Sequence, residues 1–441
     1  MSKFFNTING LLNNKFTHNT AYLLSEKVIR LVGSFLVFSQ IAKYLGPNNF
    51  GIYNYSIALF TILMAIVNFG LHGILVKHLC VEDEAKYKSY LGSAFLIKFL
   101  LGLIFLFTLF IVYPFIFESI LRGELTVIIC FGLLFQSFTV IECWFEAKVD
   151  NKLVSLTKSS FFVLYVIIVT IAVYFKVSLV SLCYLFVIEI VLRSLALTIA
   201  YQKSGERIFD YKVDKRIVFA LLRDGFPLVM SSVAAIIYLK IDQIMIGEML
   251  NDTELGYYSG AVRISEAIYF VPWIIANSVF PLIVENKKHG WKRHVSEFRK
   301  LSGYFLIISF LVSLVLFSAS YYLVLLVLGV EYLDSVLVLK IHIWSIVFVS
   351  LRALVNKWFI VEGMYKKLFL LELIGALINI ILNFCLIPIL GIIGAAIATL
   401  ISYSLISYFG LLIFKDSRKV FYIFSTSIKL PIDLLIKRFK K

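Results

Sequence analysis

Long apolar stretches alternate with short polar connections along almost the whole chain. Each stretch is at least about as long as the roughly 20 residues that a helix needs to cross the hydrocarbon core of a bilayer. Breaker residues separate several of them, as at Gly46–Pro47, Asn251–Asp252 and Pro388. The pattern predicts an all-α polytopic membrane protein with about twelve transmembrane helices. The predicted spans are 21–43, 51–70, 90–113, 124–147, 153–175, 178–200, 218–246, 255–284, 301–328, 335–360, 368–387 and 391–414.

The composition fits a membrane protein and excludes other classes. Of the 441 residues, 61% are hydrophobic and 16% are charged, whereas soluble domains have about 45–50% and about 25%. This excludes a cytosolic enzyme, a disordered chain and a fibrous repeat. The five cysteines lie mostly in apolar stretches and form no CxxC pair, so we expect neither a disulfide framework nor a zinc site. The polar first 20 residues lack the pattern of a cleaved signal peptide, so we expect the first span to stay in the protein.

Basic residues are concentrated in every second connection. The N-terminus and the alternate connections that follow it, ending with residues 415–441, hold 29 Lys and Arg residues, and the other six connections hold 2. Cytoplasmic connections of membrane proteins carry the excess of Lys and Arg. We therefore predict an even number of spans with both termini in the cytoplasm. The net charge of +15 follows from this topology, and we expect no nucleic-acid partner.

The second half of the chain repeats a feature of the first. Residues 40–53 end one span, turn and begin the next with Phe-Gly-Ile-Tyr, and residues 243–258 do the same with Leu-Gly-Tyr-Tyr. Six spans per half make the halves parallel repeats, with a cavity between two lobes. The last residues, KLPIDLLIKRFKK, predict an amphipathic helix on an anionic membrane surface. We predict an N-terminal lobe at 1–205, a C-terminal lobe at 206–414 and a basic cytoplasmic tail at 415–441.

Several basic residues lie inside the predicted spans. Lys98, Arg193, Arg263 and Arg352 lie too deep to reach an interface easily. A charge at that depth costs about 2.5–3.5 kcal/mol on insertion scales, and it usually faces the interior of a helix bundle or a water-filled cavity. The spans therefore predict a protein with a cationic interior.

Four stretches of the chain resemble one family. They are LGPNNFGIYNYSIALFTIL (45–63), ECWFEAKVDNK (142–152), LGIIGAAIATLIS (390–402) and, most specifically, residues 224–275, which begin DGFPLVMSS. Together they look like the bacterial O-antigen and polysaccharide-biosynthesis flippases of the multidrug/oligosaccharidyl-lipid/polysaccharide exporter superfamily. The resemblance extends over nearly the whole chain.

The resemblance implies a twelve-helix, two-lobe transporter in the bacterial inner membrane. It implies that the cargo is an undecaprenyl-diphosphate-linked oligosaccharide, moved by alternating access from the cytoplasmic to the periplasmic leaflet. The expected partners are this glycan, the lipid bilayer, and the polysaccharide polymerase and other membrane proteins of glycan assembly. The sequence does not identify the glycan.

A diphosphate crossing a membrane needs a compensating positive field in a water-filled cavity. Arg suits this role because its planar guanidinium binds phosphate oxygens bidentately and stays ionised. The family comparison places the first two helices of each lobe at the cavity, which favours Arg30, Lys240 and Arg263 as substrate-binding residues. Lys98 and Arg352 have no acidic partner one turn away and are further candidates.

Acidic residues close to these cations leave other interpretations open. Glu26 lies four residues before Arg30, and Glu266 lies three residues after Arg263, so each could form an ion pair on its own helix. Asp242 is two residues from a lysine and points to a different face. It could instead anchor a cation across the lobes or bind a coupling ion.

Two further pairs of charged residues have the spacing of neighbours on one helix face. Glu142 and Glu146 form a like-charge i,i+4 pair; one could hold a proton during transport, or each could pair with a loop lysine. Glu189 and Arg193 are also four residues apart, and we interpret them as a structural pair.

The first hypothesis is a flippase with no cofactor and no enzymatic activity. The chain has no GxxxxGK[ST] motif, so an ion gradient, of Na⁺ or H⁺, or removal of the product would drive transport. A cation-coupled multidrug exporter of the same superfamily is the alternative, but most of the deep charges are basic and favour an anionic cargo. A polymerase or glycosyltransferase would need a larger loop with acidic catalytic residues. A non-transporting scaffold would have little use for embedded cations without partners.

Overall fold

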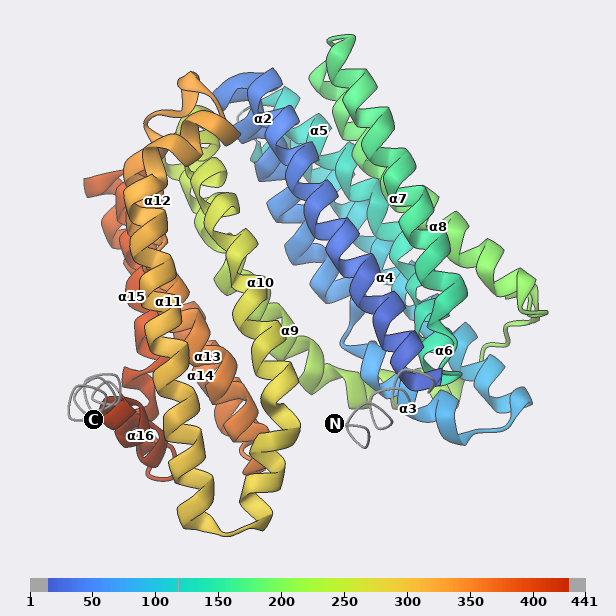
Figure 1. Ribbon diagram of the computed structural model, residues 1–441. Helices are drawn as coiled ribbons and strands as arrows, with labels where there is room; N and C mark the ends of the chain where they lie inside the picture. The colour runs from blue at the N-terminus through green and yellow to red at the C-terminus, as the bar shows by residue number, and fades with distance from the viewer. Residues whose placement is uncertain (1–14, 118, 428–441) are drawn as a thin grey trace, which may run out of the picture. The chain divides into compact units, whose positions relative to one another are not determined.

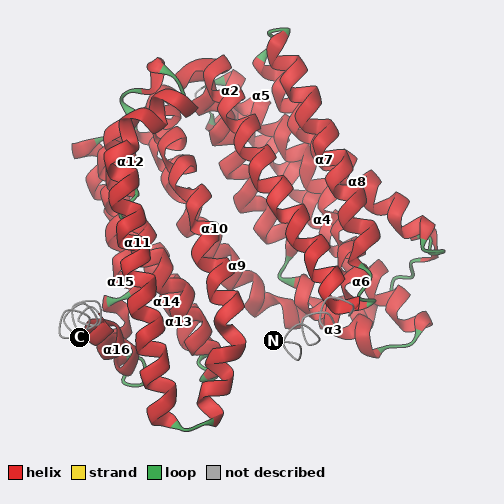
Figure 2. Cartoon of the chain, viewed as in Figure 1, coloured by secondary structure: helices red, strands yellow, loops and turns green. Residues whose placement is uncertain are grey.

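The computed structural model describes residues 15–117 and 119–427, and every regular element in these ranges is helical (Figure 2). Eleven of the helices are long and apolar enough to cross a membrane. The first of them, Ser25–Val81, has 57 residues, and at about 1.5 Å per residue it is more than twice as long as a single span needs. It breaks at Gly46, where φ is 68°. The prediction of an all-α polytopic protein is confirmed, and division of this helix at Gly46 gives twelve spans.

The predicted spans agree with the observed helices to within a few residues in most cases. The span predicted at 178–200 is the helix Leu179–Lys203, and the span predicted at 335–360 is Ser335–Val361. The two largest differences are the end of the second span, which lies at Val81 and not at 70, and the start of the helix Trp291–Val327, which lies ten residues before 301. Most of the first ten residues of Trp291–Val327 are charged or polar, so hydropathy alone does not mark them as part of a helix.

The described residues form two compact units, which divide inside two of the long helices. Among the described residues, unit 1 runs up to Leu45 and resumes from Tyr55 to Ile236, and unit 2 takes Gly46–Asn54 and the residues from Ile237 onwards. The lobe boundary predicted at 205/206 lies in the connection before the second of these helices. The units divide later because the start of that helix packs within unit 1: a Cβ on Gly225 would lie 2.8 Å from the carbonyl oxygen of Phe69.

Unit 1 contains the first six spans (Figure 1). Its elements are most of α2 (Lys15–Asn68), α3 (Leu71–Val81), α4 (Glu84–Ile116), α5 (Ile120–Cys130), the 3₁₀ helix η1 (Phe131–Thr139), α6 (Val140–Ala147), α7 (Asn151–Tyr174), α8 (Leu179–Lys203), the short η2 (Ile208–Asp210) and the first half of α9 (Lys215–Met249).

Unit 2 contains the remaining spans and the first helix of the basic tail. Its elements are the rest of α9, α10 (Asp252–Lys288), α11 (Trp291–Val327), η3 (Val330–Tyr332), α12 (Ser335–His342), α13 (Ser345–Val361), α14 (Tyr365–Leu390), α15 (Ile392–Ser407), η4 (Phe409–Leu412) and α16 (Arg418–Ser427). The amphipathic helix predicted for KLPIDLLIKRFKK (429–441) lies outside the described residues.

The two units have the same pattern of neighbouring helices. The fifth and sixth spans pack against each other in both, as α7 with α8 and as α14 with α15 (Figure 1). The fourth span packs against the second, third and sixth spans of its unit. This span is also interrupted in both, by η1 between α5 and α6 and by the break between α12 and α13. The common pattern supports the internal repeat that the sequence predicts.

The glycines of the two repeated motifs meet within unit 2. A Cβ on Gly51 would lie 1.7 Å from the carbonyl oxygen of Asp252, and a Cβ on Gly256 would lie 1.9 Å from the carbonyl oxygen of Pro47. Each glycine thus contacts the residue that lies four positions before the other glycine. The contact is two-fold symmetric and is formed by backbone, so only glycine fits at either position.

We expect Gly256→Ala to lower the melting temperature of the purified protein by several degrees. The added methyl group overlaps backbone that no side-chain rotation can move, and overpacking costs about 1–3 kcal/mol. The matched control is Gly73→Ala in α3, where a Cβ meets no atom within 4 Å and alanine favours the helix. Equal melting temperatures for the two variants would contradict the contact.

Candidate functional site

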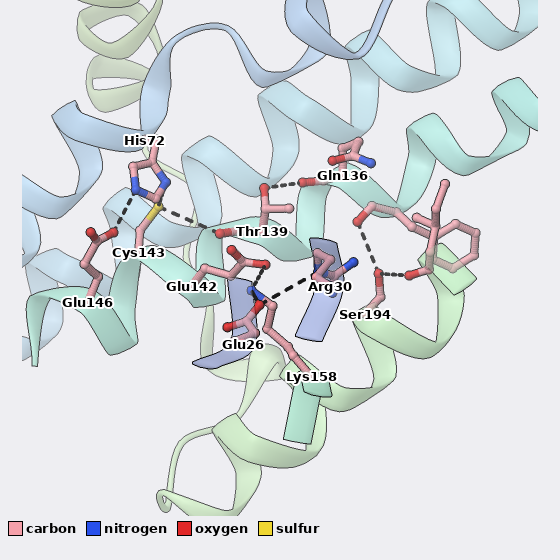
Figure 3. Close-up of polar contacts among 12 residues, drawn as sticks. Glu26, Arg30, His72, Gln136, Thr139, Glu142, Cys143, Glu146, Lys158 and Ser194 are labelled. Carbon is pink, nitrogen blue, oxygen red and sulfur yellow. Dashed lines mark hydrogen bonds and ion pairs between the residues drawn. The ribbon is translucent and has the colours of Figure 1, made fainter. Parts of the chain in front are cut away.

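Five charged side chains of unit 1 form a connected set, which we call the unit 1 charge network. Lys158 Nζ lies 2.9 Å from Glu26 Oε1 and 3.3 Å from Glu142 Oε1 (Figure 3). Arg30 Nη1 lies 2.9 Å from Glu189 Oε1, and its Nε lies 4.0 Å from Glu26 Oε1. Four helices, α2, α6, α7 and α8, supply the members. Three carboxylates therefore share two cations inside the bundle.

Arg30 is held by more than its carboxylate partners. Its guanidinium lies 4.7 Å above the centre of the Phe162 ring, an arrangement in which the ring face attracts the cation. The Arg30 side chain is 29% exposed, whereas that of Glu189 is 14% exposed. The stacked guanidinium is thus oriented by the ring and remains accessible from one side.

Lys98 is buried in unit 1 at 2% exposure. Its Nζ donates to Asn68 Oδ1 at 3.1 Å and to Thr139 Oγ1 at 2.7 Å. No carboxylate lies within 4 Å of it among the described residues. Lys98 therefore ties α4 to the end of α2 and to the 3₁₀ segment of the fourth span, where neutral oxygens accept its hydrogen bonds.

Glu142 and Glu146 have separate partners in spite of their spacing. Glu142 pairs with Lys158, while Glu146 Oε2 lies 2.7 Å from His72 Nε2 (Figure 3). The other ring nitrogen of His72 lies 3.4 Å from Cys143 Sγ. The two carboxylates therefore do not share one site, and His72 links α3 to α6.

In unit 2, Glu266 pairs with a cation from the neighbouring helix. Lys240 Nζ lies 3.3 Å from Glu266 Oε2, so Glu266 is not held by Arg263 on its own helix. Arg263 is exposed and forms no ion pair or side-chain hydrogen bond with the residues that the structure describes. The sequence placed Arg263 and Glu266 on one face, but the acid turns towards α9.

Asp242 is a buried carboxylate at 3% exposure. Its Oδ2 accepts a short hydrogen bond from the Tyr258 hydroxyl, and its Oδ1 accepts one from the backbone N–H of Gln243 at 2.8 Å. The Tyr258 hydroxyl also lies 3.5 Å from Thr399 Oγ1. Within residues 15–117 and 119–427, no basic side chain lies within 4 Å of Asp242. A single buried carboxylate without a cation is costly unless it is protonated or binds an ion.

Arg352 is buried at 5% exposure and forms an ion pair with Glu372 of α14 through its Nε and Nη2. His342 is buried as well, and its Nδ1 lies 2.7 Å from Ser265 Oγ and 3.3 Å from the Tyr269 hydroxyl. Both arrangements join neighbouring spans of unit 2.

Sequence reasoning missed several partners in these sites. The sequence predicts Arg193 as the partner of Glu189, and it does not mark Lys158, Glu372 or Tyr258 as members of a site. The available signal was the position of Glu189 and Glu372, each the only acidic residue in its apolar span. An embedded acid needs a partner, and that partner need not lie on the same helix.

A family model for polysaccharide biosynthesis proteins matches residues 16–287 of the chain. No curated protein matches the chain significantly.

Three solved structures share the fold at low sequence identity. A multidrug resistance MATE family transporter of the MOP superfamily has a TM-score of 0.73 at 14% identity, over 90% of this chain and 96% of its own. The lipid II flippase MurJ has a TM-score of 0.70 at 16% identity, over 95% and 92%. A MOP superfamily transporter from Pyrococcus furiosus has a TM-score of 0.61 at 15% identity, over 94% and 98%.

We expect Arg352→Met to destabilise the protein, because it leaves Glu372 in the span without its cation. Removal of one partner of a buried ion pair costs about 3–5 kcal/mol, whereas replacement of both by apolar residues is often neutral. The double variant Arg352→Met/Glu372→Leu should therefore recover most of the lost thermal stability and membrane abundance. A double variant as unstable as the single one would show that Arg352 has another essential partner.

Proposed function

The chain belongs to the polysaccharide biosynthesis protein family, and on that premise we propose that it is a flippase for an undecaprenyl-diphosphate-linked oligosaccharide. It would carry this cargo by alternating access from the cytoplasmic to the periplasmic leaflet of the bacterial inner membrane. The fold that it shares with the lipid II flippase MurJ and with MATE transporters agrees with a role in transport.

The depth and exposure of Arg263 are the main support for the proposal. It lies eleven residues after Asp252, the first residue of α10, or about 17 Å along a helix that is long enough to span the membrane. At this depth an exposed guanidinium must face a polar space, because hydrocarbon does not solvate it. With no carboxylate partner among the described residues, it is available for an anion such as a diphosphate.

Arg30 in unit 1 and Lys240 in unit 2 are further candidates for binding the diphosphate, each argued from its own unit. Arg30 pairs with Glu189 at 2.9 Å and lies 4.0 Å from Glu26, whereas Lys240 pairs with Glu266 at 3.3 Å. Both side chains remain partly exposed. Lys98 and Arg352 are more deeply buried and bind side chains of neighbouring helices, so we assign them to the structure of their units.

Asp242 is the proposed site of ion coupling. A coupling ion, H⁺ or Na⁺, would supply the positive charge that this carboxylate lacks. The positive-inside distribution of Lys and Arg supports a cytoplasmic position for both termini. The proposed partners are the lipid-linked glycan and the membrane proteins of glycan assembly, including the polymerase.

A multidrug exporter is the second candidate function, and the buried carboxylate of Asp242 favours it. A buried carboxylate without a cation suits a positively charged drug as well as a coupling ion. The embedded Arg263 disfavours it, because an unpaired guanidinium repels a cationic cargo.

We expect Arg263→Ala to lower flipping by about 10- to 100-fold, because a hydrogen bond to a charged group contributes about 1.5–3 kcal/mol. Arg263→Lys should retain part of the activity, since it keeps the charge and loses the bidentate geometry. The assay is complementation of a bacterium that has the chain's native glycan pathway and lacks its flippase, scored by surface glycan and by accumulated lipid-linked repeat units.

Arg223→Ala is the control for this experiment, because Arg223 is exposed and pairs with Asp224 at 3.0 Å. Normal flipping by Arg263→Ala at normal membrane abundance would remove Arg263 from the site. Drug resistance without any restored glycan would favour the exporter.

We expect Asp242→Asn to uncouple transport from the ion gradient. Asparagine keeps the size of the side chain and its hydrogen bond to Gln243, but it neither binds a proton nor neutralises Na⁺. In proteoliposomes, an imposed pH or Na⁺ gradient should accelerate flipping by the wild type and leave the variant unchanged. An equal response of both proteins would place coupling elsewhere.

A further inference from the structure

Glu189 is the carboxylate that accepts a hydrogen bond from Arg30, a proposed substrate-binding cation of unit 1. Its Oε1 lies 2.9 Å from Arg30 Nη1, and the bond joins only one oxygen to one nitrogen. Arg30 presents five N–H donors in all, so this contact leaves most of the guanidinium available. A diphosphate, with more charge and more oxygens, would compete with Glu189 for the same group.

Arg30 keeps its orientation without Glu189. Its guanidinium stacks on Phe162 at 4.7 Å, and Glu26 lies 4.0 Å from its Nε. These contacts come from α7 and α2, whereas Glu189 comes from α8. Departure of Glu189 therefore leaves a positioned cation rather than a disordered one.

A second cation lies within reach of Glu189. Arg193 is four residues further along α8, a spacing that places two side chains on one helix face. It is partly buried, and no hydrogen bond or ion pair joins it to any residue in the described ranges. Its charge acts on Glu142 and Lys98 only through space. The spacing on α8 therefore offers Glu189 a second partner on its own helix if it leaves Arg30.

We propose that Glu189 is the internal counter-ion of the empty carrier, which pairs with Arg30 when no substrate is bound and moves to Arg193 when a diphosphate takes Arg30. This inference rests on the proposed function. In the empty state Glu189 neutralises Arg30, so the substrate-binding guanidinium is not left as an unpaired charge while the carrier returns. In the loaded state the diphosphate neutralises Arg30 and Arg193 neutralises Glu189.

Substitutions of Glu189 and Arg193 should change the affinity for the diphosphate in opposite directions. Glu189→Gln removes the competitor, so the Kd for the diphosphate should fall by about tenfold or more. Arg193→Gln removes the second partner of Glu189, which makes displacement from Arg30 harder, so the Kd should rise by a similar factor. In the double variant Glu189→Gln/Arg193→Gln no carboxylate has to move, and the Kd should return to that of Glu189→Gln.

The proposal also predicts different effects on net flipping and on exchange of bound lipid. Net flipping requires the empty carrier to return, whereas exchange of one bound lipid for another does not. Glu189→Gln should therefore reduce net flipping about tenfold and leave exchange close to that of the wild type. A residue that acted only in folding would reduce both equally.

The probe is radiolabelled undecaprenyl diphosphate without sugars, measured for binding in nanodiscs and for net flipping and exchange in proteoliposomes. Arg223→Ala is the control and should match the wild type. If the wild type binds the probe but the Kd does not fall in Glu189→Gln and rise in Arg193→Gln, the role of Glu189 is overturned and the flippase proposal stays intact. Absence of binding by the wild type and by every variant would overturn both. If Glu189→Gln does not fold, a Kd for Arg193→Gln that equals the wild-type value is sufficient to overturn the inference.

Discussion

Hydrocarbon solvates neither a charge nor an unpaired backbone group, and this constraint organises the whole protein. Helices satisfy the backbone groups within each span, and ion pairs between neighbouring helices satisfy most embedded charges. Embedded charges that depart from this rule among the described residues include Arg193 and Arg263, which have no anion, Lys98, which is held by neutral oxygens, and Asp242, which has no cation. A charge without an opposite partner costs stability unless something offsets it, and for this reason the proposed function rests on Arg263 and Asp242. The ion pairs that follow the rule are Arg30–Glu189, Lys240–Glu266 and Arg352–Glu372.

The same constraint explains why a buried lysine lies beside the interrupted fourth span of unit 1. The 3₁₀ segment η1 has nine residues, whereas runs longer than 3–4 residues are uncommon. Thr139, at its end, donates to the carbonyl oxygen of Gln136 at 2.6 Å and accepts from Lys98. The polar side chains thus supply hydrogen bonds where the regular helical ladder stops, and Lys98 contributes to the fold at a position where a free cation would not be stable.

Sequence alone was sufficient for the spans but not for the contacts between them. A span is local, since twenty apolar residues in a row are visible without knowledge of the fold. Arg30 and Glu189 form a pair although they lie 159 positions apart in the sequence. Helix periodicity relates only residues three or four positions apart, so it cannot predict this pair. Helix periodicity did place Glu26 beside Arg30, and the structure has them 4.0 Å apart. It did not predict that Glu266 turns to Lys240, because that choice depends on which neighbouring helix approaches.

The contact between Gly51 and Gly256 explains why the internal repeat is so faint. Because backbone atoms form both sides of it, the contact fixes the identity of two residues and leaves the surrounding side chains unspecified. Each half of the chain could then change almost every other residue independently and still keep the shared geometry. The two halves differ at most positions, yet both carry a glycine at the point where a single methyl group would be too large.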